Sequence, residues 1–148
     1  MKIGELASIT NCQVETIRYY EREGLLPAPE RTEGNYRFYT QEHLEKLSFI
    51  RNCRALDMTH EEIRQLLKYR DDPASSCGGV NELIDDHIEH VRSRIASLQA
   101  LQAQLVELRR NCSENHETAE CGILHQLTSG DGIQIEEISS HVARSHKH

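Results

Sequence analysis

The chain has 148 residues, of which 5% are aromatic and 28% charged, and its formal net charge is −7 at pH 7. Sparse aromatics and high charge favour a helix-rich, elongated protein over one large globular core. No apolar run approaches the roughly 20 residues of a membrane-spanning helix, and residues 1–10 lack the features of a secretory signal. These absences predict a cytoplasmic protein with no membrane partner.

The negative charge lies mainly in the second half of the sequence. Residues 1–70 carry eleven basic and eleven acidic side chains, whereas residues 71–148 carry six and thirteen. Because attraction to a polyanion depends on local charge, the balanced first half remains compatible with nucleic acid as a partner.

Two short helices joined by a tight turn are expected first. Apolar residues recur at helical spacing over residues 3–9 and 13–22. Asn11, which lies between them, tolerates the left-handed backbone conformation that such a turn often needs. Two helices with so short a connection predict a helix-turn-helix.

A hairpin is expected after these helices. Gly24 suits the end of the second helix. Gly34-Asn35 lies between polar and aromatic residues within residues 29–39, which is typical of a hairpin turn. A hairpin in this place is a wing, so the pattern predicts a winged helix-turn-helix.

Two further helices complete the domain over residues 1–70. The first begins after Thr40. Its apolar positions are Leu44, Leu47, Ile50 and Leu56. Thr59-x-x-Glu62 has the form of a capping box, which predicts the second helix through Tyr69.

One long helix is predicted over residues 80–111, after a linker over residues 71–79 that contains Pro73, two serines and two glycines. Its apolar residues recur at intervals of three and four. They are Val80, Ile84, Ile88, Val91, Ile95, Leu98, Leu101, Leu105 and Leu108. Such a stripe indicates a coiled coil, and nothing else in the chain is long enough to cover it. A second copy of the helix is the economical partner, so we expect a homodimer.

Polar and cationic side chains of the second helix and the wing are predicted to contact DNA. Arginine pairs with phosphate or guanine, and a tyrosine hydroxyl donates to phosphate oxygens. The candidates are Thr16, Arg18, Tyr19 and Arg22 in the helix and Tyr36, Arg37 and Tyr39 in the wing. For a lone helix-turn-helix pattern, ordinary solvated surface residues are an equal alternative.

Three of the five cysteines flank the long helix. Cys77 precedes it, Cys112 follows 35 residues later, and Cys121 completes a Cys-x8-Cys loop. A straight helix would hold Cys77 and Cys112 roughly 50 Å apart, too far for one chain to join them. In an antiparallel pair of helices, Cys77 of one subunit meets Cys112 of its partner. The spacing therefore predicts two equivalent three-thiolate sites in each dimer.

These cysteines predict a site for a soft metal ion. Thiolates select Cd(II), Hg(II), Pb(II), Zn(II) or Cu(I) over Mg(II) and Ca(II), and a reducing cytoplasm disfavours disulfides. Cys12, in the helix-turn-helix turn, and Cys53, beside apolar residues, are instead expected to be buried without a metal role.

Histidines offer a secondary metal site. His87 and His90 lie three residues apart and should project together from the long helix. The tail over residues 129–148 could add His141, His146 and His148. A solvated helix face and a flexible tail explain these histidines equally well. His116, inside the cysteine loop, is a further candidate ligand, whereas His43 is expected to be incidental.

The chain resembles the MerR family of winged-helix regulators. The resemblance lies in Lys2-Ile-Gly-Glu-Leu-Ala7, in residues 14–26 and in Gly34-Asn-Tyr-Arg-Phe-Tyr39, and it continues through the long helix. It implies a dimer that binds double-stranded promoter DNA whose spacer is too long for RNA polymerase, and that untwists this DNA when its effector arrives.

Residues around the cysteines are similar to the cadmium- and lead-responsive branch of that family. They are Asp71-Asp-Pro-x-x-x-Cys77-Gly, Asp86-His-Ile-Glu-His90 and Leu105-Val-Glu-Leu-Arg-Arg110. Within the family, a cysteine at the head of the long helix resembles the sensors of divalent ions, whereas copper(I) sensors have serine there. The Cys-x8-Cys loop also fits mercury sensors, and zinc sensors often have a second cysteine where this chain has Ser113. The resemblance favours Cd(II) or Pb(II), then Zn(II), then Hg(II).

The sequence thus predicts a mainly α protein. Its expected parts are a winged helix-turn-helix DNA-binding domain (1–70), a linker (71–79), an antiparallel coiled-coil dimerisation helix (80–111), a metal-binding loop with a short helix (112–128), and a flexible His-rich tail (129–148). Two other functions stay open, a metal-buffering protein and a thiol redox regulator in which Cys112 and Cys121 form a disulfide. An enzyme is not expected, because the sequence has no nucleophile beside a base and no phosphate-binding glycine loop.

Overall fold

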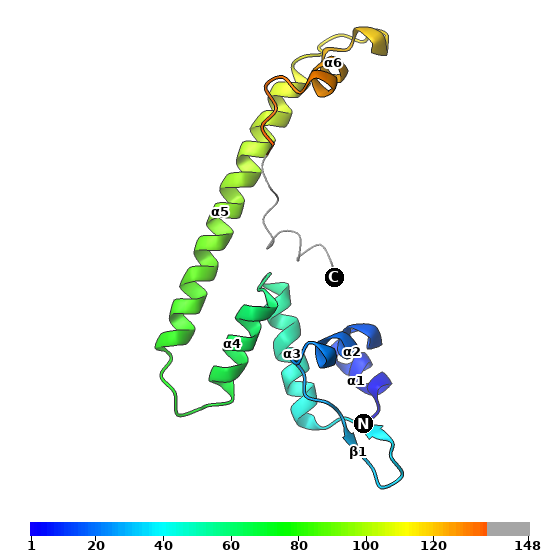
Figure 1. The fold of residues 1–148 in the computed structure, drawn as a ribbon, viewed down its shortest axis with the longest axis vertical. Helices are drawn as coiled ribbons and strands as arrows, with labels where there is room; N and C mark the ends of the chain where they lie inside the picture. Colours follow the sequence, from blue (N-terminus) through cyan, green and yellow to red (C-terminus); the bar gives the residue numbers. More distant parts are fainter. Residues whose placement is uncertain (136–148) are drawn as a thin grey trace. The chain divides into compact units, whose positions relative to one another are not determined.

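The computed structural model describes residues 1–135, and the chain divides into two compact units at Leu83–Ile84. It is mainly helical, as predicted. The elements of the described part, drawn in Figure 1, are α1 (Ile3–Thr10), α2 (Val14–Arg22), β1 (Glu30–Arg31), β2 (Arg37–Phe38), α3 (Gln41–Ala55), α4 (His60–Arg70), α5 (Gly78–Arg109), the 3-10 turn η1 (Thr118–Glu120) and α6 (Gly122–Ser129). Among the described helices, none has the length and apolar character needed to cross a membrane.

The helix-turn-helix forms as the sequence predicts. Asn11 adopts the left-handed conformation, with φ 55° and ψ 39°, and its N–H bonds the Ala7 carbonyl at the end of α1. α1 packs against α2 and α3. Arg51 of α3 donates a hydrogen bond of 2.7 Å to the Thr10 carbonyl, which is one of the acceptors left over at the end of α1. The turn is therefore stabilised by the Asn11 bond to α1 and by the Arg51 bond from α3.

The wing is a two-stranded antiparallel hairpin. Glu30 pairs with Phe38 and Arg31 with Arg37, and Asn35 takes a positive φ of 67° in the turn. Both predictions, the hairpin and its turn, are confirmed. At its base, the Tyr39 N–H donates to the Met1 carbonyl at 2.7 Å, which fixes the wing to the residues before α1.

Capping side chains fix where α3 and α4 begin. The predicted box of Thr59 and Glu62 is present at α4, with hydrogen bonds of 3.2 and 2.9 Å. At α3, the buried His43 accepts the Thr40 N–H at Nδ1, and its Nε2 lies 3.1 Å from the Ala28 carbonyl. His43, which the sequence analysis gives no role in metal binding, thus has a structural role as the cap of α3.

Leu56 departs from the predicted apolar face of the third helix. α3 ends at Ala55, and the Leu56 side chain is 63% exposed. The next residue, Asp57, takes a positive φ of 62° and turns the chain, so that Met58 is buried instead. Helical spacing fails here because the backbone leaves the helix one residue before Leu56.

α5 is longer at its start than predicted and shorter at its end. It begins at Gly78 instead of residue 80 and ends at Arg109 instead of residue 111. The prediction gave Gly78 and Gly79 to the linker because glycine is a poor helix former. The Ser76 hydroxyl accepts the Gly78 N–H at 3.1 Å and so satisfies one of the free donors of the first turn.

Candidate DNA interface and metal-binding cysteines

α2 presents its cationic side chains to solvent. Ile17 and Tyr20 are buried in the first unit, while Arg18 and Arg22 are exposed. Thr16 and Tyr19, two further candidates, are half-buried. This division follows from the amphipathic sequence of α2, because a 3.6-residue period places its charged residues opposite its apolar ones.

Tyr19 lies against α4. Its ring centroid is 5.6 Å from that of His60, with the planes inclined at 53°. Arg64, one turn further along α4, donates a hydrogen bond of 2.6 Å to the Glu23 carbonyl just beyond α2. The ring contact and the hydrogen bond together fix the orientation of α2 relative to α4.

The structure brings four of the seven predicted DNA-contact residues to one hollow, whereas Thr16, Tyr19 and Arg22 do not line it. Arg18 of α2 and Tyr36 and Arg37 of the wing line one open hollow of about 510 Å³, with Tyr39 at its base. Tyr36 and Arg37 are exposed. A concave surface with several cationic side chains concentrates positive potential, which attracts a phosphate backbone.

Tyr39 lies beneath this surface. Its side chain is 2% exposed, and its hydroxyl donates a hydrogen bond of 2.5 Å to Glu21. Burial, and then the hydrogen bond to the Glu21 carboxylate, raise the pKa of Tyr39 far above its usual range. The hydroxyl therefore stays protonated and joins α2 to the wing. Direct contact of this hydroxyl with phosphate stays a prediction.

Two of the three flanking cysteines meet in the second unit. Cys121 is the residue that caps the start of α6, and its thiol lies near enough to that of Cys112 for each to change the pKa of the other. The Cys112 sulfur also lies 4.0 Å from Nδ1 of His116. The structure thus groups the candidates of the loop, while Cys77 is exposed immediately before α5, at the opposite end of that helix.

The two thiols of the loop have different acidities. The pKa of Cys121 is lowered, first by the N–H of Leu124 in α6 and then by the thiol of Cys112. The pKa of Cys112 is raised, mainly by the neighbouring thiol of Cys121. Of the two thiols, Cys121 therefore loses its proton more easily, and a thiolate is the form that binds metal.

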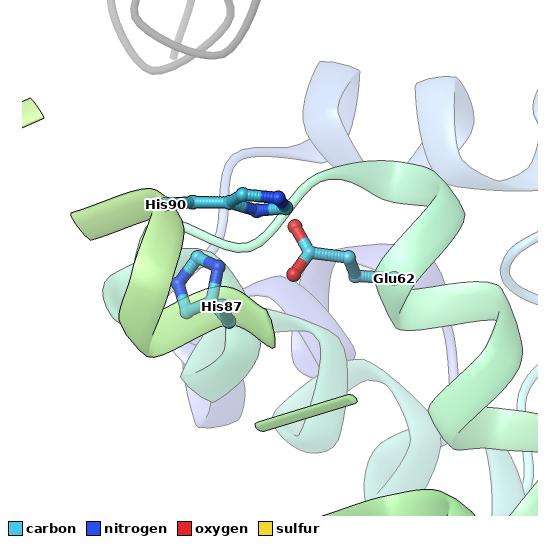
Figure 2. Close-up of side chains that lie close together, drawn as sticks. All are labelled: Glu62, His87 and His90. Atoms are coloured by element: carbon cyan, nitrogen blue, oxygen red, sulfur yellow. The ribbon is translucent and has the colours of Figure 1, made fainter. Parts of the chain in front are cut away.

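His87 and His90 face one another on α5, as predicted. Their ring centroids are 6.3 Å apart and the rings are nearly perpendicular (Figure 2). The tail histidines His141, His146 and His148 lie outside the described residues.

The remaining cysteines differ in burial. Cys53 is buried on α3, as predicted, and burial raises the pKa of its thiol to about 11. Cys12 is half-buried, and its thiol lies 3.6 Å from the Thr10 carbonyl.

Comparison with known proteins gives two family matches that overlap along the chain. The model for the MerR HTH family regulatory protein matches residues 1–70, and the model for MerR, DNA binding matches residues 44–108. A curated relative, the HTH-type transcriptional regulator ZntR homolog of Haemophilus influenzae, is 48% identical over 79% of this chain and 87% of its own length. The chain belongs to the MerR family.

Two solved structures are similar to this MerR-family chain over nearly their whole length. The regulator PbrR691 from Ralstonia metallidurans CH34, in complex with lead(II), is 54% identical with a TM-score of 0.78, over 86% of this chain and 98% of that one. The dual-function regulator MerR from Bacillus megaterium MB1, in complex with mercury(II), is 32% identical with a TM-score of 0.66, over 86% and 99%. The predicted family and fold are confirmed.

Sequence reasoning missed two residues of this MerR-family chain that shape the candidate sites. Lys2 lines the hollow beside Arg18, and the signal was a cation directly before α1. Gly122 lies so close to the end of α5 that an added Cβ would come within 2.4 Å of the Asn111 carbonyl oxygen. No local signal pointed to Gly122, because its neighbour is eleven residues away in the sequence.

Proposed function

We propose that this chain is a metal-responsive transcription regulator that binds double-stranded promoter DNA as a homodimer in the cytoplasm. When a soft divalent metal binds its cysteines, it distorts that DNA so that RNA polymerase can use an overlong promoter spacer. The observation that carries the proposal is the grouping of Cys112 with His116 and Cys121 in the loop beyond the end of α5, in a chain whose winged helix-turn-helix presents a cationic hollow.

The apolar stripe of α5 supports the dimer. Five of its residues in the second unit are about half exposed in the single chain, namely Ile88, Ile95, Leu98, Leu101 and Leu105. A continuous apolar row of this length on a helix surface marks an interface, because leaving it in water is unfavourable. Antiparallel pairing would bring Cys77 of one subunit to Cys112 and Cys121 of its partner.

The proposed ligands of each site are therefore Cys77 from one subunit and Cys112 and Cys121 from the other. A lowered Cys121 pKa and a neighbouring thiol suit a soft ion such as Cd(II) or Pb(II). Lead(II) in the complex of PbrR691 supports this order, while relatives named for zinc and mercury keep Zn(II) and Hg(II) next. His116 is a candidate additional ligand, and His87 and His90, with the tail histidines, a candidate secondary site.

The decisive test is transcription in vitro from a promoter with an overlong spacer. We expect Cd(II) or Pb(II) to activate the wild-type protein at the lowest free concentration, with Zn(II) and Hg(II) requiring more. The Cys112→Ser variant should lose activation and keep its affinity for DNA without metal, whereas Cys12→Ser, the matched control, should respond normally. Full activation of Cys112→Ser by all four ions would contradict the proposal.

Thiol redox sensing is the second candidate, favoured by the same contact between Cys112 and Cys121. Thiol titration under air, with and without Cd(II), separates the two functions. Loss of two thiols per chain in air together with a change in transcription would favour the redox regulator. Retention of all five thiols together with a response to metal would favour the metal sensor.

A further inference from the structure

The first turn of α5 lies directly against a tyrosine of α4. A Cβ added at Gly79 would lie 1.9 Å from Oη of Tyr69, 2.4 Å from Cζ and 2.9 Å from Cε1. Real side chains do not approach so closely, so the ring of Tyr69 can occupy this place only because residue 79 has no side chain. At the neighbouring Gly78 an added Cβ would meet only the Ser76 hydroxyl, at 3.4 Å.

The connection between α4 and α5 is shaped by local hydrogen bonds and is tied to α3 by the 3.2 Å contact of Lys46 with Asp71. The Asp72 N–H donates to the Tyr69 carbonyl at 3.2 Å, and Ser75 bonds the Asp72 carbonyl through both its N–H and its hydroxyl, at 3.0 and 2.7 Å. These bonds shape the turn but do not reach α5. Packing of Gly79 on the half-buried Tyr69 ring joins the two helices directly.

Cys77 is hydrogen-bonded to this first turn of α5. Its carbonyl accepts the Asn81 N–H at 2.9 Å, so Cys77 is attached to α5 by the hydrogen bonding of the helix itself. Gly79 lies only two residues further on. A displacement of Cys77 on binding metal would therefore change the position of Gly79 against Tyr69.

α4 would carry such a displacement to α2, the proposed recognition helix. Tyr69 is one residue from the end of α4, and the same helix contacts α2 through His60, against Tyr19, and through Arg64, at the Glu23 carbonyl. A helix transmits movement along its axis because its backbone hydrogen bonds make it stiff. A continuous path of packed and bonded groups thus runs from Cys77 to α2.

We propose that Tyr69 is a positioning residue that couples metal binding at Cys77 to the DNA-binding helices through its packing against Gly79. The inference rests on the proposed function, since it takes Cys77 as a metal ligand. Tyr69 binds neither metal nor DNA in this scheme. Its contact with Gly79 sets how far occupation of the metal site changes the orientation of α4 and α2.

The test is a set of full-length variants built around this contact. Gly79→Ala introduces the clash, and Gly78→Ala is its matched control, with the same gain in helix propensity one residue earlier and no clash. Tyr69→Leu removes the atoms that an added Cβ would meet. Each protein is measured for Cd(II) stoichiometry, for DNA affinity without metal, and for Cd(II)-dependent transcription.

We expect Gly79→Ala and Tyr69→Leu to bind Cd(II) at the wild-type stoichiometry and to bind DNA within about twofold of wild type. Their activation by Cd(II) should fall at least about fivefold, the lower end of ordinary allosteric coupling. The double variant should be no worse than Tyr69→Leu alone, because residues in contact give non-additive effects. Gly78→Ala should behave as wild type throughout.

Other outcomes would overturn the proposal in distinguishable ways. Normal activation of either single variant, or additive losses in the double variant, would remove Tyr69 from the coupling. If Gly79→Ala does not fold, Tyr69→Leu beside Gly78→Ala decides the question alone. If the wild-type protein neither binds nor responds to Cd(II), Pb(II), Zn(II) or Hg(II), the proposed function fails and this inference fails with it.

Discussion

At the residue scale, positions with a positive φ mark the places where the first unit turns. Asn11, Asn35 and Asp57 are non-glycine examples, between α1 and α2, in the wing, and after α3. Asparagine and aspartate enter this region more easily than other residues because their short polar side chains bond the nearby backbone. The two asparagines place the recognition helix and the wing on one side of the domain, where Arg18 and Arg37 line the same hollow.

Arg18→Ala and Arg37→Ala should each weaken DNA binding and leave the helical content unchanged, because both side chains are exposed at the hollow. Loss of a base contact should cost about 1 to 3 kcal/mol at the cognate site, and loss of a phosphate contact should lower the salt dependence instead. Binding at several salt concentrations measures both effects. Arg92→Ala, at an exposed arginine of α5, is the control. Unchanged binding by both variants would exclude the hollow as the interface.

Cys53 should make the first unit less stable in alkali. Burial, and then the charge of Glu62, raise the pKa of its thiol to about 11 in the folded chain, against about 8.5 when unfolded. Because the folded pKa is the higher one, the stabilising contribution is full below about pH 8.5 and disappears as the pH rises through about 11. We expect the wild-type protein to lose about 2 to 3 kcal/mol more over this window than Cys53→Ala, because one pKa unit corresponds to about 1.4 kcal/mol.

Urea unfolding at several pH values measures this difference. Tyr20 and Tyr39, whose pKa values are also raised, titrate in both proteins and therefore cancel in the comparison. If the free energy of unfolding changed with pH in the same way for both proteins, folding would not raise the pKa of the Cys53 thiol.

At the element scale, α5 has 32 residues and exposes much of its apolar stripe in the single chain. Helices of this kind are stabilised mainly by packing of an apolar face, because backbone propensity alone is a small term. The contacts within the described chain do not cover this face from Ile88 to Leu105, which is why a second copy of α5 is the proposed partner.

Leu98→Asp should dissociate the dimer, because it would place a charge in the paired apolar face. Leu98 is 54% exposed in the single chain, so the helix itself should persist after substitution. We expect the dissociation constant from analytical ultracentrifugation to rise at least about tenfold, equivalent to about 1.4 kcal/mol. Ser97→Asp, on the adjacent exposed residue, should leave it unchanged. A dimer equally tight in both variants would place the interface elsewhere.

At the scale of the whole molecule, the proposed metal site would be shared between subunits, so each subunit would depend on the other. Cys77 lies before α5, and Cys112 lies three residues beyond its end. In an antiparallel dimer, every site would combine the start of one α5 with the loop that follows the other. Metal binding would then depend on formation of the dimer.

A mixed dimer tests this arrangement. Cys77→Ser and Cys112→Ser homodimers should each lose tight binding, because each lacks one ligand at both sites. A heterodimer with one copy of each should contain one site missing both cysteines and one complete site, and should therefore bind Cd(II) at about half the wild-type stoichiometry. If sites lay within single chains, no complete site would form. Isothermal titration of the purified heterodimer measures the number of sites.

The sequence alone determined the elements, their order and the family. Helical periodicity, the Thr59-x-x-Glu62 box and the positions of Asn11 and Asn35 are local signals, since each structure depends on residues a few positions apart. The Cys-x8-Cys loop is also a local signal, because only eight residues separate Cys112 from Cys121.

Only the tertiary structure decided how these elements are fixed to one another. Tyr39 with Glu21, His43 with Ala28, and Tyr69 with Gly79 are partners separated by ten or more positions. Such pairs meet because several helices pack at once, and no periodicity within one segment encodes which side chain will lie opposite a glycine. For that reason the sequence does not reveal that Tyr39, His43 and Gly79 each pack at a junction between elements.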